Sequence, residues 1–264
     1  MEKGKLVALS FDIEEFDVPL ENGRDIPFSE QMRISRYGAH KILDIMKRHE
    51  VRATFFCTAN FAENAPDVVK RIVDEGHEVA SHGCYHSDFK MDHLAESKAR
   101  LEKLSGQSVY GYRMARMAPL AESDVANAGY EYNSSLNPTF IPGRYNNTDL
   151  PATKFEKDGV VQIPASVSPI FRLPLFWLGL HNYPFWLYKK LAKWTLADRK
   201  ALVIYMHPWE FYNLHELKQK YALSWIMTHN CGNALEKRLC SLIECLKKSD
   251  ADFVTMHTLA SADW

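Results

Sequence analysis

Two histidines spaced four residues apart, His82 and His86, are the first candidates for chemistry in this sequence. If their segment coils into a helical turn, residues four apart share a face and both imidazoles can reach one metal ion. A carboxylate would have to complete a catalytic set with positions left open for water and substrate. Taken alone, the spacing is more often structural or incidental, because eleven histidines make a chance pair easy.

Short apolar runs alternate with longer amphipathic runs along nearly the whole chain, a pattern typical of βα units. The predicted strands are Leu6–Asp12, Val51–Cys57, His77–Ser81, Val109–Arg113, Tyr130–Asn133, Val160–Ala165, Leu202–His207 and Phe253–His257. The predicted helices are Ile34–Arg48, Pro66–Glu75, Met91–Leu104, Glu122–Ala128, Pro184–Leu196 and Ala234–Lys248. No repeat or linker interrupts the alternation, so we predict one domain over residues 1–264, built as an incomplete or distorted α/β barrel.

Reactive side chains fall at the carboxyl ends of these predicted strands. They are Asp12 with Glu14 and Glu15 after it, His82 and His86 after the third strand, Arg113, and His207. In α/β barrels this edge carries the active site. Carboxylates within reach of the two histidines make a metal site the favoured interpretation.

Five segments in this order resemble the polysaccharide deacetylases, the carbohydrate esterases with NodB homology. They are Ser10-Phe11-Asp12-Ile13-Glu14, Ala53-Thr54-Phe55-Phe56, Gly76-His77-Glu78-Val79-Ala80-Ser81-His82 with His86, Gly111-Tyr112-Arg113, and His207-Pro208-Trp209-Glu210. The resemblance implies a distorted (β/α) barrel with seven or eight strands and one divalent metal ion, usually zinc. It also implies hydrolysis of an N-acetyl group from an amino sugar.

The first segment departs from the common family pattern, in which two adjacent aspartates serve as base and metal ligand. Ile13 stands where the second aspartate is expected. The chain resembles the variant in which the ligand follows two residues after the base, which assigns Asp12 as base and Glu14 as ligand. Residues i and i+2 of a strand share a face, so both carboxylates can enter one site. Glu15 should then point away, with a solvated or supporting role.

The resemblance assigns the remaining roles with further departures. Arg113 would hold Asp12 ionised and oriented, although the x-Pro that often follows this arginine is replaced by Met114-Ala115. His207 would protonate the departing amine, since amide cleavage without an acid expels a poor leaving group. Asn133 stands where related sequences tend to carry an aspartate. Cys84, between the two histidines, should face away from the metal.

Substrate contacts are expected from Trp177, Trp209 and Arg116, although for Arg116 a surface charge is the simpler interpretation. Residues 167–194 are rich in aromatics and proline, but charged residues interrupt them, so they do not form the ~20-residue apolar span that a transmembrane helix needs. We expect the part from Phe171 to Tyr188 to form a wall of the substrate groove, because flat aromatic faces suit sugar rings. A peripheral membrane contact and simple buried packing are the alternatives.

The amino-acid composition limits which binding partners and which cellular compartment are expected. The chain carries 32 basic and 33 acidic residues and no lysine- or arginine-rich block, so nucleic acid is not an expected partner. Four apolar residues near the start, Leu6 to Leu9, are too few for a signal peptide. Five cysteines without a C-x-x-C pair argue against a disulfide framework. Together these features predict a cytoplasmic location.

The predicted function is therefore metal-dependent removal of N-acetyl groups from an amino-sugar-containing saccharide. One alternative is a metal-free hydrolase of a cyclic amide or another C–N bond, which some members of the superfamily cleave. The other is a non-catalytic carbohydrate-binding component of polysaccharide assembly. Retention of a base, three metal ligands and an acid argues against the non-catalytic alternative.

Overall fold

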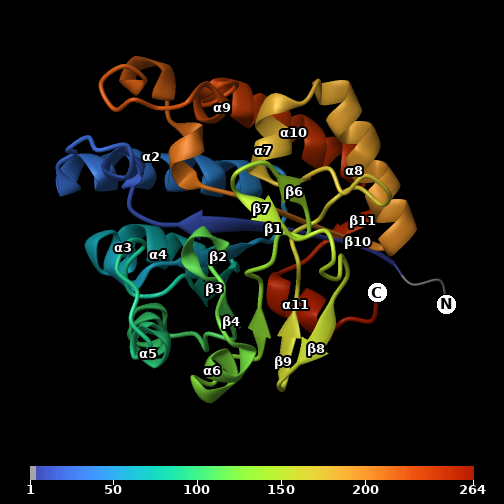
Figure 1. The fold of residues 1–264 in the computed structure, drawn as a ribbon, viewed down its shortest axis with the longest axis horizontal. Coiled ribbons are helices and arrows are strands. Elements are labelled where there is room, and N and C mark those ends of the chain that lie inside the picture. The colour runs from blue at the N-terminus through green and yellow to red at the C-terminus, as the bar shows by residue number, and fades with distance from the viewer. Residues whose placement is uncertain (1–3) are drawn as a thin grey trace.

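The computed structural model describes residues 4–264. Its centre is a curved sheet of nine strands, in which seven parallel neighbours follow the order β10-β1-β2-β3-β4-β5-β9 and antiparallel β8 forms the edge (Figure 1). β11 pairs in parallel with the first residues of β1. The strands of this sheet are β1 (Lys5–Ile13), β2 (Thr54–Cys57), β3 (Glu78–Ser81), β4 (Gly111–Tyr112), β5 (Tyr132–Asn133), β8 (Phe155–Lys157), β9 (Val160–Gln162), β10 (Ala201–Met206) and β11 (Ala251–Phe253).

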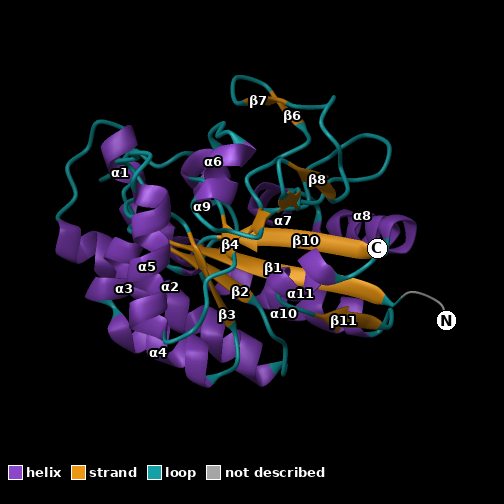
Figure 2. Cartoon of the chain, turned by 90° about the horizontal axis from the view of Figure 1, so that it is seen from below, coloured by secondary structure: helices purple, strands orange, loops and turns teal. Residues whose placement is uncertain are grey.

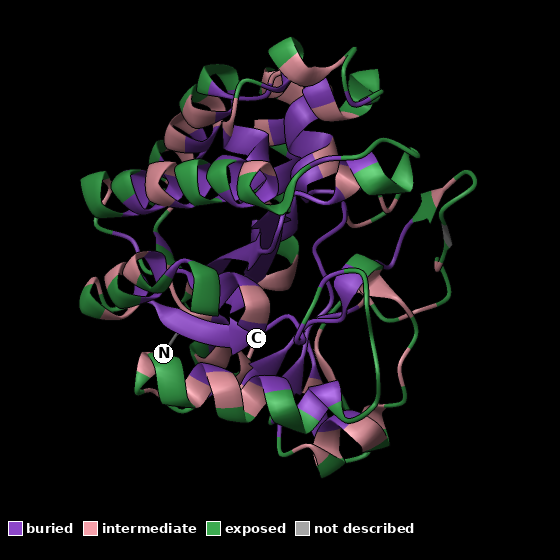
Figure 3. Cartoon of the chain, turned by 90° about the vertical axis from the view of Figure 1, so that its left-hand side faces the viewer, coloured by how far each residue is buried: buried purple, intermediate pink, exposed green. Residues whose placement is uncertain are grey.

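Helices surround the sheet (Figure 2), and the longer ones are buried on one side and exposed on the other (Figure 3). The α-helices are α1 (Val18–Glu21), α2 (Phe28–Arg48), α3 (Ala59–Asn64), α4 (Pro66–Asp74), α5 (His93–Ser105), α6 (Glu122–Asn127), α7 (Trp177–Asn182), α8 (Phe185–Arg199), α9 (Trp225–Thr228), α10 (Asn233–Lys247) and α11 (Met256–Ser261). The 3-10 helices are η1 (Ala115–Met117), η2 (Pro208–Phe211) and η3 (Leu214–Leu217). Within residues 4–264, no helix combines the length and apolar character needed to cross a membrane.

The pleat of β1 separates two cores. Val7, Leu9, Phe11 and Ile13 belong to the large core between the sheet and the helices, whereas Ala8 packs inside the barrel. Successive side chains of a strand point to opposite faces, so Asp12 and Glu14 share the inner side with Ala8. Met256 and Leu259 of α11 pack in this inner core, beside β1.

The barrel is distorted where β9 approaches β10. After β9 the chain meets β10 without forming a regular ladder: the Ser166 N–H donates to the Val203 carbonyl oxygen at 2.9 Å, and the Val203 N–H donates to Ser166 Oγ at 2.8 Å. The predicted distorted (β/α) barrel is confirmed, with the seven parallel neighbours and β11 as an eighth parallel strand. The long connection after β5 holds the separate hairpin of β6 (Phe140–Ile141) and β7 (Tyr145–Asn146), followed by β8.

One predicted strand is wrong in its second half. Phe253–His257 was expected to be extended, but β11 ends at Phe253 and α11 begins at Met256. Thr255 explains the change, because its hydroxyl accepts the Thr258 N–H and caps the new helix. All six predicted helices are present, with boundaries shifted by up to six residues. The short α1, α3, α7, α9 and α11 were not predicted.

Candidate active site

The end of β1 places two carboxylates at one edge of the sheet. Asp12 and Glu14 are each 2% exposed, and Ile13 between them faces the helices. Glu15 lies on the opposite side, where it accepts hydrogen bonds from Thr58 Oγ1, at 2.9 Å, and from Asn60 Nδ2. Burial raises the pKa of Glu15. Glu15 is therefore directed away as predicted, but it is buried and held by side chains rather than solvated.

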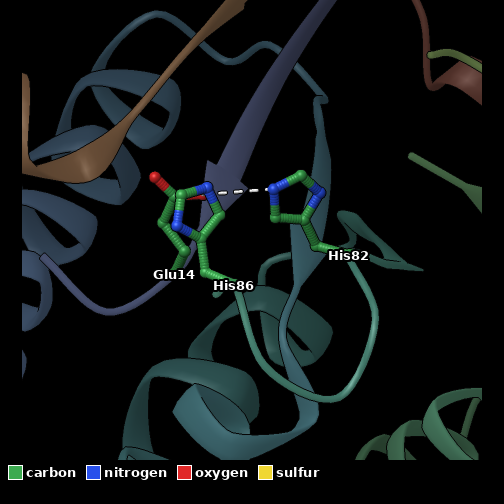
Figure 4. A group of neighbouring side chains, drawn as sticks. All are labelled: Glu14, His82 and His86. Carbon is green, nitrogen blue, oxygen red and sulfur yellow. Dashed lines mark hydrogen bonds and ion pairs between the residues drawn. The ribbon is translucent and has the colours of Figure 1, made fainter. Parts of the chain in front are cut away.

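Glu14, His82 and His86 form a compact buried group (Figure 4). Oε2 of Glu14 lies 3.1 Å from Nε2 of His82 and 3.2 Å from Nε2 of His86. One ligand atom from each residue lies within 4.8 Å of the other two. The histidines approach from a loop after β3 rather than from the helical turn considered above, because Gly83 has a φ of +86° that breaks regular coiling.

The other ring nitrogens of this group are held by acceptors. Nδ1 of His82 donates to the Arg113 carbonyl oxygen at 2.8 Å, and Nδ1 of His86 donates to Oδ1 of Asp17 at 2.8 Å. Nε2 of each ring is therefore directed at Glu14 and is the atom that would offer a lone pair to an ion, the arrangement that supporting residues impose on metal-binding histidines. Trp209 Nε1 donates to Oε1 of Glu14 at 3.1 Å. Two imidazoles and one carboxylate with this support fit a divalent ion.

Charges within the group favour a cation there. Burial alone would raise the pKa of Glu14, but His86, His82 and His207 outweigh it and hold this pKa far below the usual value. Burial alone would lower the pKa of His86, but Glu14 and Asp17 raise it to about 9. A carboxylate that stays ionised in a buried pocket attracts positive charge.

Asp12 is fixed by a buried ion pair. Arg113, fully buried, donates from Nη1 to Oδ1 of Asp12 at 2.6 Å and stacks over the Phe56 ring at 4.0 Å. Ser134 holds the guanidinium through its carbonyl oxygen, at 3.0 Å, and its hydroxyl, at 2.9 Å. Asn133 bonds to Gln162 and Ser135, so it is the neighbouring Ser134 that orients the arginine.

His207 faces Asp12 across the site, with Nε2 3.8 Å from Oδ2 of the carboxylate. Its Nδ1 donates to Oε1 of Glu210 at 2.6 Å, and Oε2 of Glu210 lies 2.9 Å from Nε2 of His181. Nδ1 of His181 donates to the His229 carbonyl oxygen at 2.9 Å. Burial lowers the pKa of His207, but the hydrogen bond to Glu210 and the charges of Glu14, Glu210 and Asp12 together raise it above the usual value.

These side chains open into a cleft of about 320 Å³. Trp177 and Trp209, the predicted substrate contacts, line it with 8% and 3% of their surface exposed. Arg116 lies at the same cleft and pairs with Glu21 at 2.5 Å. The expectation that the whole aromatic segment forms the groove wall is wrong: Phe176, Trp177 and Leu178 line the cleft, whereas Trp186 lies outside its lining on α8 and is 68% exposed.

Sequence reasoning missed two supporting residues, Asp17 and His181, and gave no role to a third, Glu210. Glu210 closes the His207-Pro208-Trp209-Glu210 segment, and its spacing of three from His207 was the available signal for that role. Asp17 and His181 meet their partners only through loop and helix packing, 69 and 29 residues away in the chain. No local sequence pattern predicts contacts between residues so far apart in the chain. Cys84 points away from the histidines, and its Sγ donates to the His93 carbonyl oxygen at 3.7 Å.

Comparison with solved structures places the fold. A protein from Mycobacterium smegmatis assigned as a polysaccharide deacetylase superposes with a TM-score of 0.67 at 20% identity, over 98% of this chain and 91% of that one. Puue allantoinase superposes with a TM-score of 0.70 at 18% identity, over 98% and 90% of the two chains. At these identities the likeness establishes the fold alone.

Sequence comparison places the family. A peptidoglycan deacetylase of Helicobacter pylori is 30% identical over 153 residues, which cover 52% of this chain and 51% of that protein. Matches to the curated relatives compared cover between 18% and 51% of their length. Residues 134–261 match a domain of unknown function (DUF3473). Residues 2–132 match the polysaccharide deacetylase model and carry all three residues of the Glu14, His82 and His86 group together with Asp12 and Arg113; this part of the chain is a polysaccharide deacetylase region by that match.

Proposed function

We propose that the protein is a metal-dependent hydrolase that removes N-acetyl groups from an amino-sugar-containing saccharide. The observation that carries the proposal is the meeting, in one cleft, of the Glu14, His82 and His86 group with Asp12 on one side and His207 on the other. The name of the Helicobacter relative and the family match support the same reaction.

Glu14, His82 and His86 would hold one divalent ion, in the first place zinc, which two imidazoles and a carboxylate bind well. When bound, such an ion supplies a Lewis acid that polarises the acetyl carbonyl and makes water acidic enough to react near neutral pH. Trp209 and Asp17 keep the carboxylate and the His86 ring in place for it.

The two remaining side chains carry the proton transfers. Asp12, kept ionised and oriented by Arg113, takes a proton from the water whose oxygen attacks the acetyl carbon. His207 gives a proton from Nε2 to the amine nitrogen as the C–N bond breaks, so acetate and a free amino sugar leave. Glu210 assists this step, because it binds Nδ1 and raises the pKa of His207.

The proposal also includes the domain organisation, the cellular compartment and the substrate contacts. Residues 1–264 would act as one catalytic domain, supported by β10 and β1, which pair over six residues and join the two matched regions. Five free cysteines support a reducing, cytoplasmic compartment. The aromatic cleft residues Trp177 and Trp209, with Arg116, would contact the saccharide.

The test is metal content together with acetate release. Purified protein is dialysed, its metal is measured by elemental analysis, and acetate is measured with a panel of N-acetylated glycans before and after chelation. We expect one equivalent of a divalent ion and acetate release that chelation abolishes and zinc restores. Hydrolysis of a cyclic amide without bound metal would favour the first alternative function. Saccharide binding with no acetate release would favour the non-catalytic one.

A further inference from the structure

Apolar side chains form a large part of the cleft wall around the proposed catalytic group. They include three methionines, two isoleucines and a leucine, namely Met114, Met117, Ile141, Leu178, Ile226 and Met227. Methionine is flexible and adapts its shape to apolar ligands. Most of this surface comes from residues 134–261, the part of the chain outside the deacetylase match.

Polar side chains are few in the same lining. Outside the proposed catalytic group they are Glu21, Arg116, Arg144 and Ser224, together with the Tyr205 hydroxyl and the indole N–H of Trp177. Glu21 and Arg116 already bind each other, and Arg116 also donates to the Ser87 hydroxyl at 2.8 Å. Each hydroxyl of a sugar needs a hydrogen-bond partner when it leaves water. Away from the catalytic group, the apolar part of the wall offers no partners to the hydroxyls of further sugar rings.

Apolar side chains are also exposed on the two elements that carry lining residues at the rim, the β6–β7 hairpin and α9. Phe140, next to the lining residue Ile141 on the β6–β7 hairpin, is 58% exposed. On α9, Ile226 lines the cleft and is itself 45% exposed, and its neighbour Trp225 is 56% exposed. Exposed apolar surface of this kind beside a pocket marks a binding site for an apolar group.

We propose that the substrate is a glycolipid: an N-acetylated amino sugar joined to a long hydrocarbon chain, which lies along the methionine and isoleucine wall while the N-acetyl group meets the catalytic residues. This inference rests on the proposed deacetylase function and names its substrate class. A soluble polysaccharide would leave this wall unused and several hydroxyls without partners.

Kinetics with matched substrates test the proposal. Acetate release is measured on methyl and dodecyl N-acetylglucosaminide, the latter below its micelle concentration, and on N-acetylglucosamine tetrasaccharide. We expect the dodecyl compound to have a kcat/KM at least roughly tenfold above the other two, mainly through KM, since each buried methylene favours binding. Equal values for all three, or a preference for the tetrasaccharide, would overturn the glycolipid assignment while leaving the deacetylase function in place.

Binding measurements test the glycolipid inference independently of the proposed deacetylase function. Calorimetry should give a Kd for dodecyl N-acetylglucosaminide at least roughly tenfold below that for the methyl compound and below that for dodecyl maltoside, which has the chain but no N-acetyl group. If no substrate releases acetate, this comparison still decides the inference. Similar Kd values for the three ligands would overturn it.

A pair of variants tests where the hydrocarbon chain of the substrate binds. Ile226→Asp places a charge on the apolar rim and should reduce the advantage of the dodecyl over the methyl compound at least fivefold. Phe171→Asp is the matched control, because Phe171 is 72% exposed and lies outside the cleft lining. Phe171→Asp should keep the full advantage. If Phe171→Asp loses the advantage of the dodecyl compound, or if Ile226→Asp keeps it, the proposed position of the hydrocarbon chain is contradicted.

Discussion

The indole N–H of Trp209 donates to Oε1 of Glu14 at 3.1 Å, while Oε2 of the same carboxylate lies 3.1 Å from Nε2 of His82. The two oxygens of Glu14 are thus divided between an orienting hydrogen bond and the ligand group. The orienting residue comes from the second half of the chain, 195 residues away. Such support adjusts how firmly a ligand holds its ion.

Metal stoichiometry tests the assignment of Glu14. Glu14→Ala should abolish tight metal binding, as His82→Ala and His86→Ala should, because each removes one of three ligands. Trp209→Phe keeps an aromatic ring but loses the donor, and should weaken metal affinity roughly tenfold. Glu15→Ala is the control that should keep a full equivalent after dialysis, since Glu15 faces away. A full equivalent in Glu14→Ala would refute the assignment.

The opposite proton transfers assigned to Asp12 and His207 predict two deficient enzymes. Asp12→Asn and His207→Ala should each lower kcat by roughly 10²-fold or more, with the fold intact by circular dichroism. The wild-type enzyme should show a bell-shaped dependence of kcat on pH. Near-native turnover in either variant would remove that residue from the mechanism.

The contacts behind His207 predict a shift in the pH profile. Glu210→Gln removes a negative charge that raises the pKa of His207, so the alkaline limb of kcat should move to lower pH. His181→Phe leaves Glu210 with one partner fewer and should lower kcat, whereas His181→Gln retains a donor and should recover part of the loss. An unmoved alkaline limb in Glu210→Gln would mean that His207 is not the group titrating there.

Two tryptophans of the aromatic segment should behave differently. Trp177→Ala should raise KM about fivefold to tenfold, because stacking on an aromatic ring contributes ~1 kcal/mol. Trp186→Ala should leave KM unchanged, since Trp186 lies outside the cleft lining. Both variants should retain their metal. If Trp186→Ala instead releases the protein from anionic liposomes that the wild type binds, the membrane contact considered for residues 167–194 gains support.

The stability of the fold should fall at acidic pH through His77. Burial lowers the pKa of His77 to about 4, and its Nδ1 accepts the Ala53 N–H at 3.3 Å. The unfolded chain binds this proton below about pH 6.5, but the folded chain excludes it until about pH 4. His77 therefore makes its full contribution to the free energy of unfolding above pH 6.5. This free energy falls by on the order of 2 kcal/mol as the pH drops to 4.

Urea unfolding at pH 7 and pH 4 measures this effect. His77→Asn keeps an acceptor near the Nδ1 position without a titrating ring, so its free energy of unfolding should change less between the two pH values than that of the wild type. The same pH dependence in both proteins would assign the acid sensitivity to other groups.

The fold was accessible from the alternation of apolar and amphipathic runs, and the catalytic group from the ordered segments that resemble the polysaccharide deacetylases. Asp12 and Glu14 alternate with Ile13 along one strand, and this pattern alone orients them. The boundaries of β11 and α11 were not accessible, because the Thr255 side chain ends one element and begins the next. Two interpretations of Phe253–His257 fit the same apolar pattern until that hydroxyl is placed.

The supporting contacts escaped prediction because they join distant segments. His181 meets Glu210 only when α7 and η2 come together, and nothing near His181 in the chain signals an acceptor. The division of the aromatic segment was hidden for a related reason. Trp177 and Trp186 have similar surroundings in sequence, and only the bend between α7 and α8 directs one into the cleft and the other to the surface.

The two matched regions contribute different parts of the cleft, and this separation affects how the substrate range can evolve. The proposed ion ligands and base lie within residues 2–132, whereas Ile141, Leu178 and Met227 of the cleft lining lie within 134–261. Mutations can accumulate in that lining while the ion stays in place. A directed-evolution library confined to these three positions should therefore yield variants with altered acceptor range and retained chemistry.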